Sequence, residues 1–208
     1  MIEQRLHLTH VSTGELFRRE ISAKTALGNA VSRYVAQGRL VPDELVVKVM
    51  TSRLPRRLLD RGVVLDGFPR TAGQAAGLDA YLERQGWPLT AAIHLRCPAP
   101  ILVSRLSGRR VCSRCGANYH LRNIPPKRPG VCDACHGALV IRKDDDVSTI
   151  KKRLLIDQCE AKPLLAYYHR AGLLHRLNGS GSFEEVFARV MALVRAKRWL
   201  RHDRTQKR

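Results

Sequence analysis

The chain has 208 residues, 44% of them hydrophobic, and its 37 lysines and arginines outnumber 18 acidic residues, giving a formal net charge of +19. This composition predicts one globular domain with an inserted subdomain, and the lack of a long apolar run or signal peptide indicates a cytoplasmic protein without a membrane span. The charge suits either RNA or small phosphorylated substrates, but an aromatic content of 5% without a base-stacking motif disfavours a single-strand RNA platform.

Short apolar runs alternate with longer amphipathic segments along the chain, which is the pattern of an α/β fold. The apolar runs show little alternation with polar residues, which indicates strands buried on both faces of a parallel sheet. The predicted strands are residues 8–12, 62–67, 91–97 and 173–179. The predicted helices are residues 12–21, 71–85, 98–108, 147–169 and 182–200, the last starting with a capping box of Ser182 and Glu185.

Between two such units lies a segment rich in glycine and proline that contains two Cys-x2-Cys pairs, Cys112 with Cys115 and Cys132 with Cys135. This spacing predicts a tetrahedral zinc site in a small insertion whose core is too thin without a metal. Four thiolates leave no open position, so the zinc is expected to be structural. Two separate redox pairs are disfavoured, because neither pair opens a helix after a strand.

A second informative stretch, VVLDGFPRTAGQ, covers residues 63–74. It places Asp66 and Gly67 at the carboxyl end of a buried strand, where open α/β sheets bind ligands. Arg70 and Gln74 follow at the start of the next helix. The stretch therefore offers a carboxylate for a metal, a guanidinium for a phosphate and an amide for the edge of a base.

Several motifs occur in an order that resembles the adenylate kinase family, in its form with a long zinc-binding lid. They are STGELFR at 12–18, GRLVPDELV at 38–46, LDGFPRT at 65–71, GRRVC at 108–112, YH at 119–120, IPP at 124–126, RKDDD at 142–146 and KKRL at 151–154. The resemblance covers nearly the whole chain. It implies a three-layer, P-loop NTPase-like α/β fold built on a parallel sheet. The implied parts are a core segment 1–108 with AMP-binding helices at about 12–41, a lid 109–146, a core segment 147–200 and a basic tail 201–208.

The resemblance also implies roles for single residues. The AMP site would comprise Thr13, Arg18, Arg39, Leu40, Val41, Gly67, Phe68, Pro69, Arg70, Gln74, Arg142 and Arg153. The transferred phosphoryl group would be surrounded by Arg70, Arg109, Arg142 and Arg153. ATP would be bound by Arg105, Arg109, Asn118, Tyr119 and Gly181. Asp66 would hold the Mg²⁺ that accompanies ATP through water, and the four cysteines would hold structural zinc.

The implied reaction is reversible phosphoryl transfer, ATP + AMP = 2 ADP, in nucleotide homeostasis. ATP, AMP and ADP are then the partners, and a monomer is expected without membrane or nucleic-acid partners. One family element does not occur in the sequence, the strand and loop Gly-x2-Gly-x-Gly-Lys-Gly-Thr that cradle the ATP phosphates. The resemblance starts at Met1 within the following helix. A gap in the sheet, an unstable chain and weak transfer from ATP are therefore expected.

Two other functions remain open on the residues alone. The first is a non-catalytic relative that keeps the AMP pocket, which would bind AMP without turnover. The second is a zinc-ribbon protein that binds nucleic acid through its basic tail, with an affinity that falls steeply as salt rises.

Overall fold

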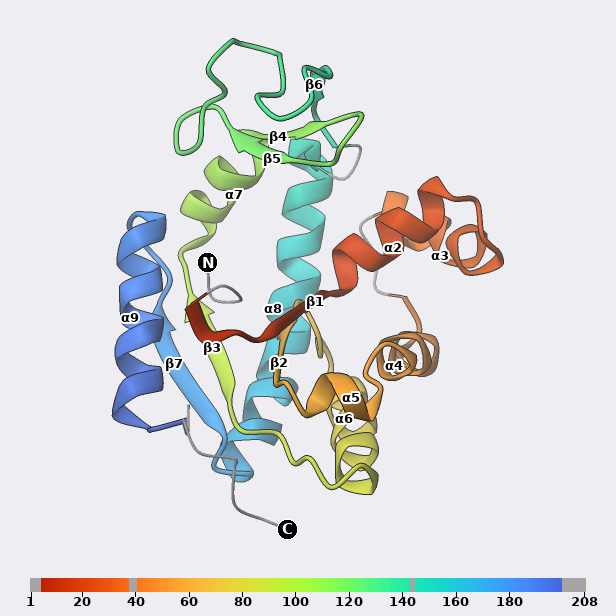
Figure 1. The fold of residues 1–208 in the computed structure, drawn as a ribbon, viewed down its shortest axis with the longest axis vertical. Coiled ribbons are helices and arrows are strands. Elements are labelled where there is room, and N and C mark those ends of the chain that lie inside the picture. The colour runs from red at the N-terminus through yellow and green to blue at the C-terminus, as the bar shows by residue number, and fades with distance from the viewer. Residues whose placement is uncertain (1–4, 38–40, 143–144, 200–208) are drawn as a thin grey trace.

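The computed structural model describes residues 5–37, 41–142 and 145–199. Strands and helices alternate along the chain, which confirms the predicted α/β class. The four long-range strands lie within the predicted ranges: β1 (Thr9–Ser12), β2 (Val63–Asp66), β3 (Ala92–Arg96) and β7 (Leu174–Asn178). Figure 1 shows them at the centre of the molecule.

The parallel strands form two pairs instead of one continuous sheet. β1 pairs with β2, and β3 pairs with β7. Within the described residues no strand joins β2 to β3 (Figure 1). Ile93 and Leu95 on β3 are accordingly 37% and 45% exposed, although strands of parallel sheets are usually buried on both faces. The four strands were thus predicted correctly, and their division into two pairs agrees with the gap in the sheet that the sequence predicts.

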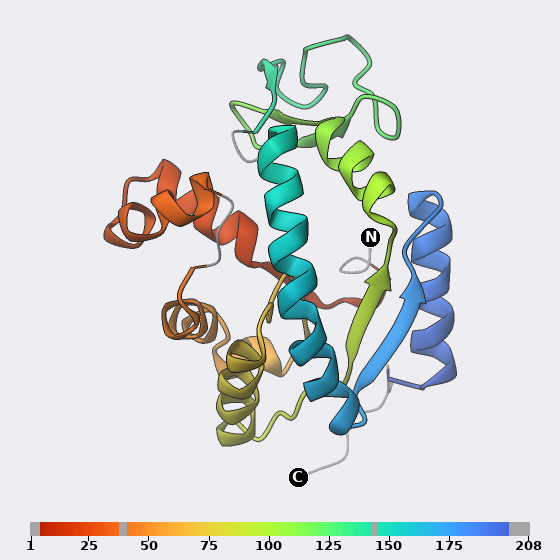
Figure 2. The same ribbon diagram turned by 180° about the vertical axis from the view of Figure 1, so that it is seen from behind.

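Eight helices are described. They are α2 (Thr13–Ser22), α3 (Ala26–Ala36), α4 (Asp43–Ser52), α5 (Arg56–Leu59), α6 (Ala72–Arg84), α7 (Ala99–Ser107), α8 (Val147–Arg170) and α9 (Phe183–Ala196). Figure 2 shows α8 crossing the molecule from end to end. None of the helices in the described ranges combines the length and the apolar character that a membrane crossing requires.

Side-chain caps explain where several helices begin. The hydroxyl of Thr71 accepts a hydrogen bond from the backbone N–H of Gln74 at the start of α6. The predicted capping box of Ser182 and Glu185 is present at the start of α9, with both reciprocal hydrogen bonds formed. α9 ends at Ala196, four residues earlier than predicted.

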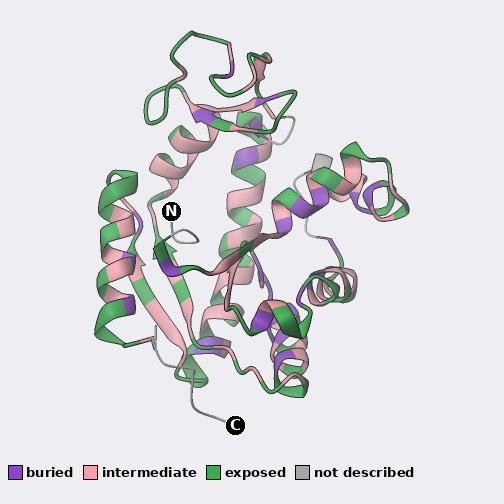
Figure 3. Cartoon of the chain, in the orientation of Figure 1, coloured by how far each residue is buried: buried purple, intermediate pink, exposed green. Residues whose placement is uncertain are grey.

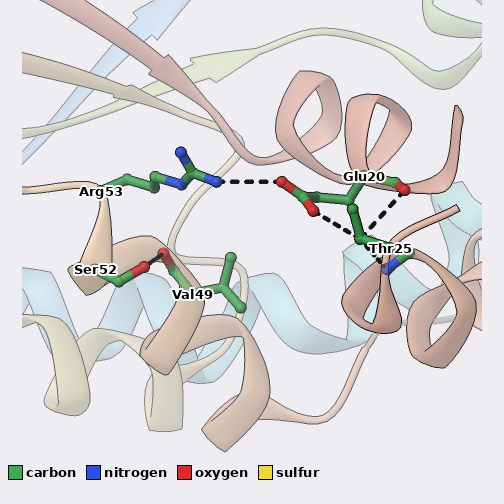
Figure 4. Close-up of polar contacts among 6 residues, drawn as sticks. Glu20, Thr25, Val49, Ser52 and Arg53 are labelled. Carbon is green, nitrogen blue, oxygen red and sulfur yellow. Dashed lines mark hydrogen bonds and ion pairs between the residues drawn. The ribbon is translucent and has the colours of Figure 1, made fainter. Parts of the chain in front are cut away.

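Helices α2 and α3 form an arm that is tied to the end of α4 (Figure 4). The hydroxyl of Thr25 donates to Glu20 Oε2 at 2.7 Å, and Arg53 donates to Glu20 Oε1 at 3.2 Å. Gly28 allows α3 to approach α2, since a Cβ atom there would lie 2.1 Å from the backbone oxygen of Glu20. These contacts set the direction of α2, which carries the predicted AMP-binding residues Thr13 and Arg18.

Most of the buried residues lie on the elements around β1 and β2, as the colouring of Figure 3 shows. The main cluster comprises Leu16, Phe17, Val31, Val41, Val46, Met50, Leu54, Leu59, Phe68, Leu78 and Leu82. A smaller cluster joins Leu6 to Val190 and Val194 of α9. The larger core therefore supports the carboxyl ends of β1 and β2, where the sequence places the AMP site.

The insertion between α7 and α8 forms a small antiparallel sheet of its own. Its strands are β4 (Arg109–Cys112), β5 (Asn118–His120) and β6 (Leu139–Val140), in the order β5-β4-β6. Figure 1 shows this sheet at one end of the molecule, above α7 and the start of α8. Within the described residues, α7 precedes this sheet in the chain and α8 follows it.

Helices α6 and α8 meet at a partly buried carboxylate. The hydroxyl of Tyr167 donates to Asp79 Oδ2 at 2.9 Å, whereas Asp79 Oδ1 is buried without a hydrogen-bond partner among the described residues. Burial raises the pKa of the Asp79 carboxyl, and the hydrogen bond from Tyr167 acts in the opposite direction. The ionised carboxylate therefore destabilises the folded chain.

We expect the substitution Asp79→Asn to raise the melting temperature at pH 7 by about 1–2 °C, because it removes this charge and keeps an acceptor for Tyr167. The folded-state pKa lies above the ordinary carboxyl value of about 3.9, so the cost of the charge is absent below that value and grows with rising pH. Thermal denaturation at several pH values measures the difference, with the exposed Asp60→Asn as control. An equal gain at pH 3.5 and pH 7 would contradict this explanation.

Candidate functional site

Two strand ends come together at the start of α2. Thr13 is buried, and its hydroxyl donates to the backbone oxygen of Gly67 at 3.4 Å. Ser12 and Asp66 are register partners in β1 and β2, which brings the residues that follow them side by side. Gly67 has a φ of +70°, a conformation that favours glycine. The carboxyl ends of the first strand pair therefore meet here, as the sequence predicts for a ligand site.

A hydrogen-bond network holds the start of α6 against α4. Gln74 is 2% exposed, its Oε1 accepts from the backbone N–H of Arg70 at 2.8 Å, and its Nε2 donates to Asp43 Oδ1 at 2.9 Å. Asp43 Oδ2 accepts from the hydroxyl of Thr71 at 2.6 Å. Sequence reasoning missed Asp43, although it lies within the quoted motif at 38–46. Among the described residues, the Gln74 amide donates through one of its two N–H bonds in this network.

The guanidinium of Arg70 lies directly over the Gly67 turn. Its Nε donates to the backbone oxygen of Gly67 at 3.0 Å, and its Nη1 lies 3.8 Å from Asp157 on α8. The Arg70 side chain remains 36% exposed, so part of the fork is open to a ligand. Arg18 lies on α2, the helix that begins at the end of β1. Its side chain folds back over Gly14, since a Cβ atom added at Gly14 would lie 3.1 Å from Arg18 Nη1.

The remaining residues predicted for the AMP site have different surroundings. Val41 and Phe68 are buried in the main core, and Pro69 follows Phe68 through a cis peptide bond. They can shape a pocket wall through packing. The predicted Arg39 and Leu40 lie outside the described residues.

Asp66, predicted to hold Mg²⁺, is exposed at the end of β2. Its Oδ2 lies 3.3 Å from His10 Nε2 on β1. Sequence reasoning did not identify His10. Its position in β1, opposite Val64 and two residues before the register partner of Asp66, was the available signal. An exposed carboxylate at a strand end has the ligand chemistry that Mg²⁺ prefers.

Two of the predicted catalytic arginines are held by partners near the insertion. Arg109 donates through Nε to Asp145 Oδ2 at 2.7 Å and through Nη2 to Asp145 Oδ1. The Asp145 side chain is fully buried, so this bidentate pair fixes the Arg109 fork. Arg142 donates to the side-chain oxygen of Asn118. Sequence reasoning missed Asp145. The fourth predicted catalytic arginine, Arg153, lies on the second turn of α8.

Arg105 closes the loop that follows β7. It projects from α7 and donates to the backbone oxygens of Gly179 at 2.9 Å and Gly181 at 2.6 Å. Gly181 has a φ of +99°. The structure thus brings together two of the residues predicted for ATP, and it fixes the plane of the Arg105 guanidinium.

The four cysteines of the insertion converge on one point. The Sγ atoms of Cys112 and Cys135 are 3.4 Å apart, those of Cys115 and Cys132 are 3.6 Å apart, and all four lie within 4.8 Å of one another. A tetrahedral zinc site with Zn–S bonds of about 2.3 Å requires sulfur–sulfur distances of about 3.8 Å. The donor set and its spacing therefore fit zinc.

Tyr119 belongs to the wall of this cluster. It is 9% exposed, and its hydroxyl lies 3.4 Å from Cys132 Sγ while accepting from the backbone N–H of Asp133 at 2.7 Å. The hydrogen bond from Tyr119 lowers the pKa of the Cys132 thiol to about 6. The hydroxyl of Tyr119, a residue predicted for the ATP site, thus points toward the metal ligands.

These features of the fold and the site define a class of protein. Parallel strand pairs carry a glycine turn and an arginine at their carboxyl ends, and further arginines lie beside a zinc-binding insertion. This is an α/β protein of the P-loop NTPase-like type, which binds phosphorylated ligands at strand ends.

Comparisons with known proteins identify the family. The family described as Adenylate kinase matches residues 1–173. The chain is 44% identical to the adenylate kinase of Moorella thermoacetica over 94% of this chain and 88% of the relative. It is 43% identical to that of Carboxydothermus hydrogenoformans, over 91% and 88%, and 41% identical to that of Clostridium botulinum strain 657, over 93% and 90%. The chain belongs to the adenylate kinase family.

Proposed function

We propose that this chain carries out the reaction of its family, the reversible transfer of a phosphoryl group from ATP to AMP that yields two ADP. The observation that carries the proposal is the convergence of Thr13, Gly67, Arg70 and Gln74 at the carboxyl ends of β1 and β2. A hydroxyl, a glycine turn, a guanidinium and an amide are the groups needed to hold a nucleoside monophosphate.

On the acceptor side, Arg70 and Arg18 bind the phosphate of AMP as planar donors. Gln74 offers its second N–H bond to the adenine edge, while Asp43 holds the amide in place. Val41, Phe68 and Pro69 line the pocket, with Arg39 and Leu40 as further members. The support is the network around Gln74, which fixes the amide before a ligand arrives.

On the donor side, Arg105 stacks on the adenine of ATP, and its bonds to Gly179 and Gly181 keep its plane fixed. Asn118 and Tyr119 complete that site from the lid. Asp66 would hold Mg²⁺ through water, and the ion would supply positive charge that neutralises the ATP phosphates. The support is the placement of Asp66 at the end of β2.

The transfer itself needs alignment and charge stabilisation rather than a covalent intermediate. The phosphate oxygen of AMP attacks the γ-phosphorus, and the bond to the β-phosphate oxygen breaks as the new one forms. Arg70, Arg109, Arg142 and Arg153 stabilise negative charge on the transferred group. Residues 109–146 form a lid that excludes water between the core segments 1–108 and 147–200, with 201–208 as a tail. A cytoplasmic monomer, in which four thiolates stay reduced, suits this role.

The test is a coupled assay of ADP formation from ATP and AMP, with AMP binding measured separately by calorimetry. We expect turnover that needs both nucleotides and Mg²⁺. The matched form carries a Gly-x2-Gly-x-Gly-Lys-Gly-Thr loop ahead of Met1 and is expected to be faster, because that loop cradles the ATP phosphates. AMP binding with no turnover in either form would favour a non-catalytic AMP-binding protein. A chain that binds RNA but not AMP, and that loses RNA binding when it is truncated at Arg195, would favour the nucleic-acid alternative.

A further inference from the structure

One face of the second strand pair is strongly basic. His94 and Arg176 are register partners in β3 and β7, as are Arg96 and Asn178. Register partners in a sheet project to the same face, and so do residues two apart along a strand. Arg96 and Arg176 are therefore diagonal neighbours on one face, next to His94.

Two adjoining pockets open on this face and share Arg176. The larger has a volume of about 610 Å³ and includes Arg96, Asn178 and Ser180 in its wall. The smaller has a volume of about 400 Å³ and reaches α8, where Lys162, His169 and Arg170 line it. No carboxylate belongs to either wall in the part of the chain that the structure describes. Volumes of this size suit a small ligand.

The positive charge in these walls is not balanced within the described residues. No salt bridge there involves Arg96, Arg176, Lys162 or Arg170. Burial lowers the pKa of His94, and the positive charges of Arg176 and Arg96 lower it further. The His94 ring therefore lies in the positive field of these two arginines. His94 Nδ1 is also buried without a hydrogen-bond partner among the described residues. A bound anion would reduce the repulsion between these positive charges and could accept hydrogen bonds from the side chains on this face.

We propose that the pockets around Arg96 and Arg176 bind a ligand with several phosphate groups, separately from the two nucleotide sites proposed above. A single phosphate would reach one guanidinium, whereas a chain of phosphates can follow the basic wall from Arg96 through Arg176 to Lys162. The ligand is either an inorganic oligophosphate or the polyphosphate tail of a nucleotide, and both share this chemistry. Arg105, which closes the neighbouring loop, belongs to the donor site and is not needed for this binding.

The test uses sodium tripolyphosphate as the probe in calorimetric titrations of the full chain at low salt without Mg²⁺. We expect saturable binding that weakens at least tenfold in both Arg96→Gln and Arg176→Gln. The control Arg84→Gln removes the same charge from an exposed position on α6 and is expected to change the affinity less than twofold. All three side chains are exposed, so the variants should keep the native melting temperature. No binding, or equal losses in all three variants, would overturn the proposal.

Two further arms identify the source of the phosphates and the independence of the site. The Arg105→Gln variant is titrated with ATP and with tripolyphosphate. Tighter binding of ATP, if it is lost in the double variant Arg105→Gln/Arg176→Gln, would identify the ligand as the polyphosphate tail of a nucleotide. Tighter binding of tripolyphosphate would identify it as an inorganic oligophosphate. Loss of tripolyphosphate binding in Arg105→Gln alone would place the probe in the donor site and refute a separate one. Binding of a single-stranded RNA 12-mer that depends on Arg176, without tripolyphosphate binding, would also refute it. ADP formation should be unchanged in Arg176→Gln, so failure here is distinguishable from failure of the kinase proposal.

Discussion

Replacement of Arg70 by glutamine is expected to weaken AMP binding about 10- to 100-fold. The guanidinium lies over the Gly67 turn, held by the backbone oxygen of Gly67 and by Asp157, and 36% of the side chain is exposed. A charged hydrogen bond to phosphate is worth about 1.5–3 kcal/mol, and glutamine cannot supply the planar, charged fork. Calorimetric titration with AMP measures the effect directly and does not depend on turnover.

The control for this variant is Arg84→Gln, which lowers the net charge equally at an exposed site on α6. The ion pair between Arg70 and Asp157 is half exposed, so its loss should barely change the melting temperature. Unchanged AMP affinity in a natively folded Arg70→Gln protein would remove Arg70 from the acceptor site. In the variant Gln74→Glu a carboxylate replaces the amide. Unchanged AMP affinity in that variant would show that Gln74 does not contact the adenine.

Local patterns in the sequence were sufficient for the elements that carry the site. The capping box of Ser182 and Glu185 was predicted from a spacing of three residues and is present, because both partners lie in one helical turn. The zinc cluster was likewise predicted from two Cys-x2-Cys knuckles, each of which places its own two sulfurs close together. The four strands were found because their apolar runs are continuous.

Partners distant in sequence were missed, because local patterns do not specify them. Asp43 meets Gln74 across 31 residues, and His10 meets Asp66 across 56. Asp145 stands in a run of three aspartates, and nothing in that run marks which one is buried against Arg109. The division of the sheet into two pairs is a different case, because the absence of the family's first strand from the sequence predicted a gap there.

Loss of zinc is expected to unfold the insertion while the rest of the chain stays folded. Among the described residues of the insertion, the buried core consists of Cys112, Tyr119 and Cys132. This is too little apolar surface to order the insertion without a metal. Structural zinc in small domains contributes about 10–16 kcal/mol of apparent binding free energy at neutral pH. Cys132→Ser should therefore abolish stoichiometric zinc and remove amide protection throughout β4, β5 and β6.

The chain offers a matched control in Cys159→Ser, because Cys159 lies exposed on α8 away from the cluster. That variant should retain one zinc per chain by elemental analysis and unchanged hydrogen exchange in the insertion. The main core around Met50 and Leu78 has no contact with the cysteines in the clusters described, so its amide protection should survive in Cys132→Ser. Protected β4 and β5 amides in a zinc-free Cys132→Ser protein would show that side-chain packing alone folds the insertion. Loss of protection in both regions would show instead that the lid and the core unfold as one unit, because α7 and α8 would then transmit the loss through their mutual contact.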